Sequence, residues 1–378
     1  MKSLTTIKKI KSFLILGRWL SPLSNDKKLP RVSSTLFEFK VNARSKKEKT
    51  IKIHMFEPLN KKISGVILVA PGLHPLGPKD PRFIRLNSIL AASGNLVFSP
   101  SIDDYTNMKI TEESLKDFTE CFKMILTHPK RPQDKKITVF SISLGSLLAL
   151  KLASNKSINQ NINSIIIYGG YGNWNSMCSD IIQKSTKQDK GYDIRNIPAI
   201  FKHLTDALIP TEDTQQSQTL DHCWEEYIKT TWTDEKYKNI DSCKQLAHRI
   251  SKKLEEPYKD IFYLGCGLKK NYDTVFFESI KKLNLMHLDP LANIHDLNCR
   301  TYLIHGKDDE LISIKEQSVI KKALPKHIQV SSYSTGFYKH SKCETPLGTL
   351  KNIEQTHQEL KTAIKILWAL SSAPITPN

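Results

Sequence analysis

The feature that most limits the fold of this chain is a series of short apolar runs that alternate with helical patterns. The run Gly65–Ala70, GVILVA, is continuous and rich in β-branched residues, and it stops at Pro71-Gly72. Such a run is typical of a strand that is buried on both faces of a parallel sheet. Similar runs occupy residues 95–98, 136–140, 164–168, 299–304 and 328–333. Because helical patterns separate these runs, we predict an α/β fold with a doubly wound, mainly parallel sheet.

The spacing of these runs predicts the domain organisation. Two strands around Phe37–Val41 and Thr50–Phe56 form an expected hairpin ahead of the first buried strand. No strong strand pattern falls between residues 173 and 290, where polar residues and helical patterns dominate. The 378 residues exceed the roughly 250 that one α/β sheet domain usually needs. We therefore predict three parts, namely a basic N-terminal tail (1–34), a core domain (35–172 and 291–378) and a mostly helical cap or lid insertion (173–290).

The final helical pattern predicts how the C-terminal helix packs. It runs from about Leu350 to Ser371. Ile353, Leu360, Ile364 and Leu367 fall on one side of this helix. We expect that side to dock on the sheet.

Positive charge is concentrated near the N-terminus. Basic residues outnumber acidic ones by 56 to 38 over the whole chain, and by 16 to 4 between Met1 and Lys62. A basic arm can bind anionic lipid or nucleic acid, or form a solvated surface. Neither interleaved aromatic residues nor a known module accompanies it, so we expect no nucleic-acid partner. Weak contact with an anionic membrane surface stays an alternative, although the apolar run Phe13–Leu16 is short and Arg18 follows it. The oligomeric state stays open.

Cysteine usage bears on the compartment. The seven cysteines are scattered and include no C-x-x-C pair, which argues against a disulfide framework and a thiolate zinc site. We expect a cytoplasmic protein, peripheral at the membrane if the basic arm binds lipid. The sequence implies no metal and no organic cofactor.

A serine-containing turn follows the predicted strand 136–140. Its sequence is Ser141-Ile-Ser143-Leu-Gly145, and an apolar helix, Leu147–Ala153, comes directly after it. A nucleophilic serine needs a sharp strand-to-helix turn with small neighbours two residues away on each side, and the usual pattern is G-x-S-x-G. The alternative is a serine-rich cap of a core helix. Because the turn lies between a buried strand and an apolar helix, we predict that Ser143 is a nucleophile.

Serine requires a base, which is usually a histidine oriented by a carboxylate. The strand 299–304 is followed by His305-Gly-Lys-Asp308-Asp309, which offers two neighbouring acids. We predict that Asp309 is the catalytic acid and keep Asp308 as the alternative. Of the 12 histidines, His340 follows the last predicted strand, where a loop can bring its ring over the serine turn. We therefore predict His340 as the base.

Acyl transfer also needs donors for an oxyanion, normally two backbone N–H groups. One is expected from Leu144, the residue after the nucleophile. The other is expected from Leu73 in the loop Pro71-Gly-Leu-His74, where Gly72 allows close approach of the backbone. His74 is expected either to contact substrate or to support this loop.

With these residues in place, the chain resembles the α/β-hydrolase superfamily over about residues 35–172 and 291–370. The matching pieces are Ala70–Leu73, Ser141–Gly145, Gly306–Asp309 and His340. Stretches 80–86, 99–103 and 168–172 look similar to a group of mostly uncharacterised bacterial members. Two departures stand out: Ser141 replaces the first glycine of the turn, and a proline replaces the histidine common before the loop glycine.

The resemblance implies a serine hydrolase that cleaves a small ester-like substrate through an acyl-enzyme on Ser143. An ester, a thioester or an amide all fit, so an esterase, a thioesterase and a peptidase stay open. The rival interpretation is a binding protein that keeps the fold without turnover, since a fold hosts many functions.

Overall fold

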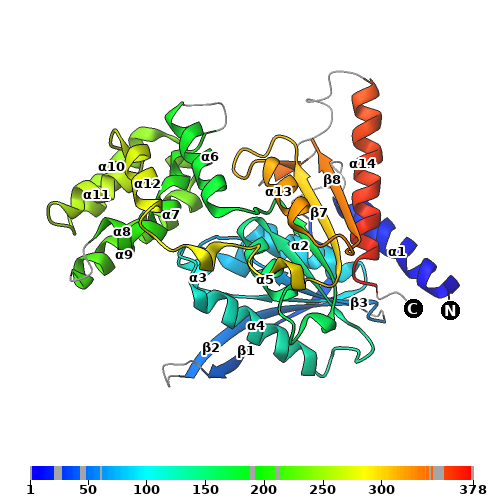
Figure 1. Ribbon diagram of the computed structural model, residues 1–378. Coiled ribbons are helices and arrows are strands. Elements are labelled where there is room, and N and C mark those ends of the chain that lie inside the picture. Colours follow the sequence, from blue (N-terminus) through cyan, green and yellow to red (C-terminus); the bar gives the residue numbers. More distant parts are fainter. Residues whose placement is uncertain are drawn as a thin grey trace. The chain divides into compact units, whose positions relative to one another are not determined.

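The computed structural model describes residues 2–20, 28–42, 48–59, 62–187, 192–209, 213–336, 338–339, 342–343 and 353–375 (Figure 1). The chain divides into two compact units. Unit 1 comprises Met1–Ile102, Glu112–Asn173 and Pro290–Asn378, and unit 2 comprises Asp103–Thr111 and Trp174–Asp289. Each unit is described by itself.

Unit 1 is built on an eight-stranded sheet with the order β1-β2-β4-β3-β5-β6-β7-β8. Pairs β1–β2 and β2–β4 are antiparallel, and every later pair is parallel. The prediction of a mainly parallel sheet is therefore confirmed. The strands are β1 (Val32–Asn42), β2 (Glu48–Pro58), β3 (Gly65–Ala70), β4 (Asn95–Pro100), β5 (Ile137–Ile142), β6 (Ile162–Tyr168), β7 (Arg300–Gly306) and β8 (Val330–Thr335).

The central strands explain why the sequence pattern was informative. All six residues of β3 and all six of β4 are buried. Ile67 and Val69 belong to one hydrophobic cluster, and the two-residue period of a strand turns Val66 and Leu68 to the other face. Continuous burial requires cover on both faces, which is what a doubly wound sheet provides.

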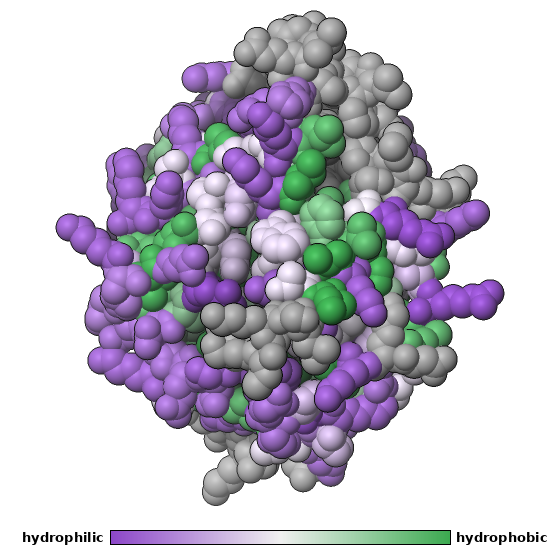
Figure 2. Space-filling model, turned by 90° about the vertical axis from the view of Figure 1, so that its right-hand side faces the viewer, coloured by the Kyte–Doolittle hydropathy of each residue, from purple (hydrophilic) through white to green (hydrophobic). Residues whose placement is uncertain are grey.

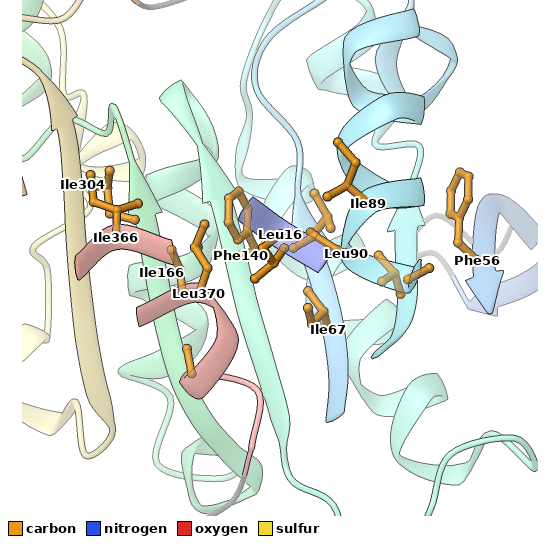
Figure 3. Close-up of a cluster of buried hydrophobic side chains, with 14 residues drawn as sticks. Leu16, Phe56, Ile67, Ile89, Leu90, Phe140, Ile166, Ile304, Ile366 and Leu370 are labelled. Carbon is orange, nitrogen blue, oxygen red and sulfur yellow. The ribbon is translucent and has the colours of Figure 1, made fainter. Parts of the chain in front are cut away.

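Three helices cover the face to which Ile67 points (Figure 3). They are α1 (Lys2–Leu20), α2 (Pro81–Ala92) and α14 (Ile353–Ser372). Their contributions to the shared cluster include Leu16 from α1, Leu90 from α2 and Leu370 from α14. Helix α5 (Ser146–Ala153) packs against β3, β5 and β6, and α4 (Glu112–Thr127) packs against α5.

The sequence predicted a basic tail over residues 1–34 and did not indicate whether it packs on the domain. Residues 2–20 of this segment form helix α1. Leu16 is fully buried in the core cluster, and the rings of Phe13 and Trp368 lie 6.0 Å apart. Burying one leucine side chain stabilises a fold by about 1.5–3 kcal/mol. Helix α1 is therefore an integral part of unit 1.

The predicted docking side of the C-terminal helix is wrong in part. Leu360 and Ile364 are 54% and 47% exposed, whereas Glu359 and Leu370 are buried. Ile353 has no described side chain, and Leu367 packs at the edge of the core. A different set of apolar positions, Ile366, Ala369 and Leu370, forms the buried side of the helix together with the paired carboxylate of Glu359.

The described part of unit 2 contains helices and no strand, as expected for a mostly helical insertion. Its longer helices are α6 (Trp174–Thr186), α9 (Thr214–Thr233), α10 (Ile240–Ser251), α11 (Tyr258–Gly265) and α12 (Tyr272–Ile280). The buried Lys202 ammonium donates to the Asn107 carbonyl at 2.8 Å and contacts Asp221 and Glu225 at 3.1 and 3.2 Å. These contacts join the short segment 103–111 to the helices that follow residue 174. None of the described helices is both long and apolar enough to cross a bilayer.

Candidate active site

Ser143 lies in a tight turn directly after β5. Strand β5 ends at Ile142, a single 3-10 turn covers Ser143–Gly145, and α5 begins at Ser146. Ser143 has φ 54°, in the left-handed region that residues other than glycine rarely occupy. Such strain is kept where the surroundings enforce it, often at functional sites. This is the backbone geometry that a nucleophilic serine between a strand and a helix requires.

Gly145 and Ser141, the small residues two positions on either side of Ser143, are required or tolerated for different structural reasons. A Cβ atom at Gly145 would lie 2.5 Å from the Ala70 carbonyl oxygen and 2.6 Å from that of Pro71, so only glycine fits there. Ser141 is fully buried, and its hydroxyl donates a hydrogen bond to the Ile166 carbonyl on β6 at 3.2 Å. The serine that replaces the usual glycine is thus accommodated by the neighbouring strand.

The predicted oxyanion loop contacts the serine turn directly. A Cβ atom at Gly72 would lie 3.5 Å from Ser143 Cβ and 3.3 Å from the Ile142 carbonyl oxygen. Leu73 follows this glycine, and Leu144 follows the serine. The backbone segments that carry both predicted donors therefore meet beside Ser143.

Asp309 and Asp308 differ sharply in their surroundings. The Asp309 side chain is 2% exposed and accepts hydrogen bonds from the Leu311 and Ile312 N–H groups at 3.0 and 2.9 Å. Asp308 is exposed. His305 is buried beneath this turn, with Nε2 2.8 Å from the Ile312 carbonyl oxygen and 3.6 Å from Asp309 Oδ2. His305 therefore supports the turn that holds Asp309 at the carboxyl end of β7.

The predicted base, His340, lies outside the described residues. The structure does describe β8 up to Thr335, Gly336 and the short strands β9 (Tyr338–Lys339) and β10 (Lys342–Cys343). Strand β9 contacts β7, the strand that ends just before Asp309.

The strand order and the strained serine turn together decide the fold. The chain has the α/β-hydrolase fold. No family model matches the sequence, and no curated protein matches it either.

Solved structures similar in fold to this chain include peptidases and esterases. An acylaminoacyl peptidase from Pyrococcus horikoshii matches at 11% identity with a TM-score of 0.49, over 93% of this chain and 43% of that one. One of two fungal esterases from Rhizomucor miehei matches at 15% identity with a TM-score of 0.44, over 97% of this chain and 91% of that one. A thermostable esterase from Pseudomonas putida ECU1011 matches at 12% identity with a TM-score of 0.47, over 97% and 89%. The chain spans less than half the length of the peptidase.

The buried carboxylate of Asp80 contacts the predicted oxyanion loop at His74. His74 Nδ1 lies 3.3 Å from Asp80 Oδ2, and the Asp80 carboxylate accepts from the backbone and side chain of Arg82. Burial would raise the pKa of Asp80, but the hydrogen bonds and charge of Arg82 outweigh it and leave that pKa lowered. Burial lowers the pKa of His74, with Asp80 opposing that change. Sequence reasoning named His74 but missed the role of Asp80; the signal that could have found it is its place before Pro81, where it caps α2.

Glu359 of α14 connects the loops that follow β7 and β8, a role that sequence reasoning missed. Its carboxylate accepts hydrogen bonds from Thr335 Oγ1 at 2.9 Å, from the Gly336 N–H at 3.0 Å and from Lys307 Nζ. Burial would raise the pKa of Glu359, but these donors outweigh it and keep the pKa below its usual value. Lys307 lies two residues before Asp309, and Gly336 lies four before His340.

Proposed function

We propose that the chain is a serine hydrolase that cleaves a small carboxylic ester, thioester or amide. The observation that carries the proposal is the left-handed φ of Ser143 at the end of β5, with the Gly72 loop in contact beside it. A strained serine at this point can present its hydroxyl to a carbonyl carbon while two backbone N–H groups face the developing oxyanion.

The proposed reaction uses only side-chain and backbone groups of this chain. His340 accepts the proton of Ser143 as the oxygen attacks the carbonyl carbon. Leu73 and Leu144 N–H groups stabilise the tetrahedral oxyanion, and Asp309 orients His340 and stabilises its charged form. The proton then passes from His340 to the leaving group, and the bond to that group breaks. Water, activated by the same histidine, attacks the acyl-enzyme, which releases the acid and restores Ser143.

Two features support the choice of residues. Asp309 is buried and held by two N–H groups, as an orienting acid must be, whereas Asp308 is exposed. Glu359 and the contact of β9 with β7 bring the segment that leads to His340 close to the end of β7. The helical insertion 173–290 is proposed to act as the cap that shapes the acyl pocket.

Turnover of p-nitrophenyl esters tests the nucleophile. Ser143→Ala should lower kcat/KM by at least about a thousandfold, because the attacking oxygen is removed. Ser141→Ala is the matched control; it removes a buried hydroxyl two residues away and should leave turnover within a few fold, with about 1 kcal/mol of stability lost. Wild-type turnover in Ser143→Ala would contradict the proposal. A folded wild type without turnover on ester, thioester and amide panels would favour the binding protein.

The base is tested in the same assay. His340→Ala should reduce kcat by at least about a thousandfold. His327→Ala provides the control, because His327 is exposed and precedes β8. Equal effects of the two substitutions would remove His340 from the mechanism while leaving Ser143 in it.

A further inference from the structure

Six large apolar side chains on α1 and α14 are exposed. They are between 45% and 63% exposed, and they make up half of the twelve large hydrophobic side chains that are exposed in the described part of the chain. The six are Ile7, Ile10, Leu14, Leu360, Ile364 and Trp368. Single exposed leucines are common on any surface, but a concentration of this kind marks an interaction site. We call these six residues the α1/α14 patch.

The two helices that carry the halves of the patch contact each other near Phe13 and Trp368. Positions 7, 10 and 14 share one side of α1, and positions 360, 364 and 368 share one side of α14, because residues three or four apart are neighbours on a helix. The helices pack on each other, with the Phe13 and Trp368 rings 6.0 Å apart. A Cβ atom at Gly17 would lie 3.8 Å from Leu367. Figure 2 looks onto the side of the molecule where Figure 1 draws α1 and α14, and hydrophobic side chains gather there between hydrophilic ones.

The patch is flanked by positive charge. Helix α1 contains four lysines and one arginine and no acidic residue. Helix α14 adds the exposed Lys361 and Lys365 next to the apolar positions. Among the described residues, no carboxylate pairs with Lys11, Lys361 or Lys365. The described carboxylate of α14, Glu359, is buried and paired with Lys307.

This combination fits the surface of an anionic bilayer. Leucine, isoleucine and tryptophan side chains enter the boundary between head groups and acyl chains, while flanking lysines attract anionic head groups. A second copy of the chain fits less well, because two such patches placed face to face would bring their cations together. We propose that the α1/α14 patch docks unit 1 on an anionic lipid bilayer. The proposal does not depend on hydrolase activity.

Vesicle flotation of the full chain tests the docking. One vesicle preparation is phosphatidylcholine alone, and the other contains about 30% phosphatidylserine to supply negative surface charge. The wild type should bind the anionic vesicles at least about tenfold more tightly, and salt should weaken this binding. Binding to neither preparation, or equal binding to both, would overturn the proposal.

Two paired substitutions, each with a matched control, locate the surface. Lys361→Glu with Lys365→Glu should weaken binding by about thirtyfold or more, since each lysine near the bilayer contributes about a factor of five. The control, Lys321→Glu with Lys322→Glu, makes the same change of charge on the exposed part of α13 (Lys315–Ala323) and should have a much smaller effect. Leu14→Ser with Ile364→Ser should weaken binding at least about tenfold. Its control, Leu36→Ser with Met286→Ser, removes side chains of similar exposure elsewhere.

Because all these side chains are exposed, each variant should keep the wild-type melting temperature. Controls that weaken binding as much as the patch variants would overturn the proposal. So would a wild-type dimer, seen by light scattering, that Leu14→Ser with Ile364→Ser converts to a monomer, because the patch would then join two copies.

Discussion

The hydroxyl of Thr335 donates a hydrogen bond of 2.9 Å to the carboxylate of Glu359. Thr335 is the last residue of β8, and Glu359 lies in α14, so the bond fixes the end of the strand that leads toward His340. The same carboxylate accepts from Lys307, just before the acid turn. One buried glutamate therefore connects the residues that come just before the proposed acid with the described residues at the end of β8.

Removing this link should impair catalysis more than substrate binding. Glu359→Ala should lower kcat by about ten- to a hundredfold with little change in KM, because a small displacement of catalytic groups costs about this much. Glu359→Gln should recover part of the rate, since its amide oxygen still accepts hydrogen bonds. Steady-state kinetics on ester substrates provides the measurement. An equal change in KM and kcat, or no rescue by glutamine, would reduce Glu359 to a purely structural role.

The lowered pKa of Glu359 also predicts a pH dependence of stability. The ionised carboxylate contributes its full stability above the usual glutamate pKa of about 4.3, and that contribution is lost as pH falls through the lowered folded value. Wild type should therefore lose more stability than Glu359→Gln when the pH is lowered from about 5 to about 3. Urea unfolding at both pH values measures the difference, and parallel losses would contradict the assignment.

Gly145 should tolerate no side chain. Gly145→Ala would place Cβ 2.5 Å from the Ala70 carbonyl oxygen, so the loop proposed to bind the oxyanion must move and its proposed donor must leave its position. Losing one such donor costs about a hundred- to a thousandfold in kcat. Gly17→Ala is the control, since the nearest atom there lies 3.8 Å away. Near-normal kcat in Gly145→Ala would show that the loop does not supply the donor.

Substitutions of the neighbouring residues Asp308 and Asp309 should have very different effects on kcat. Asp309→Asn should reduce kcat by about a thousandfold or more, because an amide can no longer stabilise a histidine cation. Asp308→Asn changes an exposed carboxylate and should leave kcat within a few fold. The opposite order of effects, measured on the same ester, would assign the acid to Asp308.

His203 should make unit 2 sensitive to mild acid. Its ring is buried, with the Ile110 N–H donating to Nε2 at 2.9 Å and Nδ1 lying 2.8 Å from the Ala199 carbonyl oxygen. Burial lowers the pKa of His203 to about 3. Protons therefore favour the unfolded state as pH falls from about 6.5 toward that value, by up to about 1.4 kcal/mol for each pH unit. Urea midpoints between pH 7 and pH 4.5 should fall more steeply in wild type than in His203→Gln, and equal slopes would contradict this account.

The fold could be predicted because burial on both faces of a strand leaves a clear mark in the sequence. Runs such as Gly65–Ala70 contain no polar residue, so the sequence indicated both the positions of the strands and their burial on both faces. The strand-to-helix turn at Ser143 could also be predicted from the sequence, because its small residues lie between a buried strand and an apolar helix. These features depend on residues that are close together in the chain.

Features that depend on pairing across the fold could not be read in this way. Glu359 can occupy a buried position because Lys307, Thr335 and Gly336 donate hydrogen bonds to its carboxylate. No pattern of residues close to Glu359 in the sequence predicts these partners. Ile366 and Leu370 share that buried side of α14, which leaves Leu360 and Ile364 exposed to solvent. The contact between His74 and Asp80 likewise depends on how the loop between them folds.

The most direct test of the account is the site of reaction with a fluorophosphonate, which modifies activated serines. Intact-mass and peptide mass spectrometry of the treated wild-type chain should find one adduct, on the peptide that contains Ser143. The adduct should be absent from Ser143→Ala and present in Ser141→Ala. An adduct on another serine, or none on the folded wild type under conditions that label a known esterase, would contradict the assignment of Ser143 as an activated nucleophile.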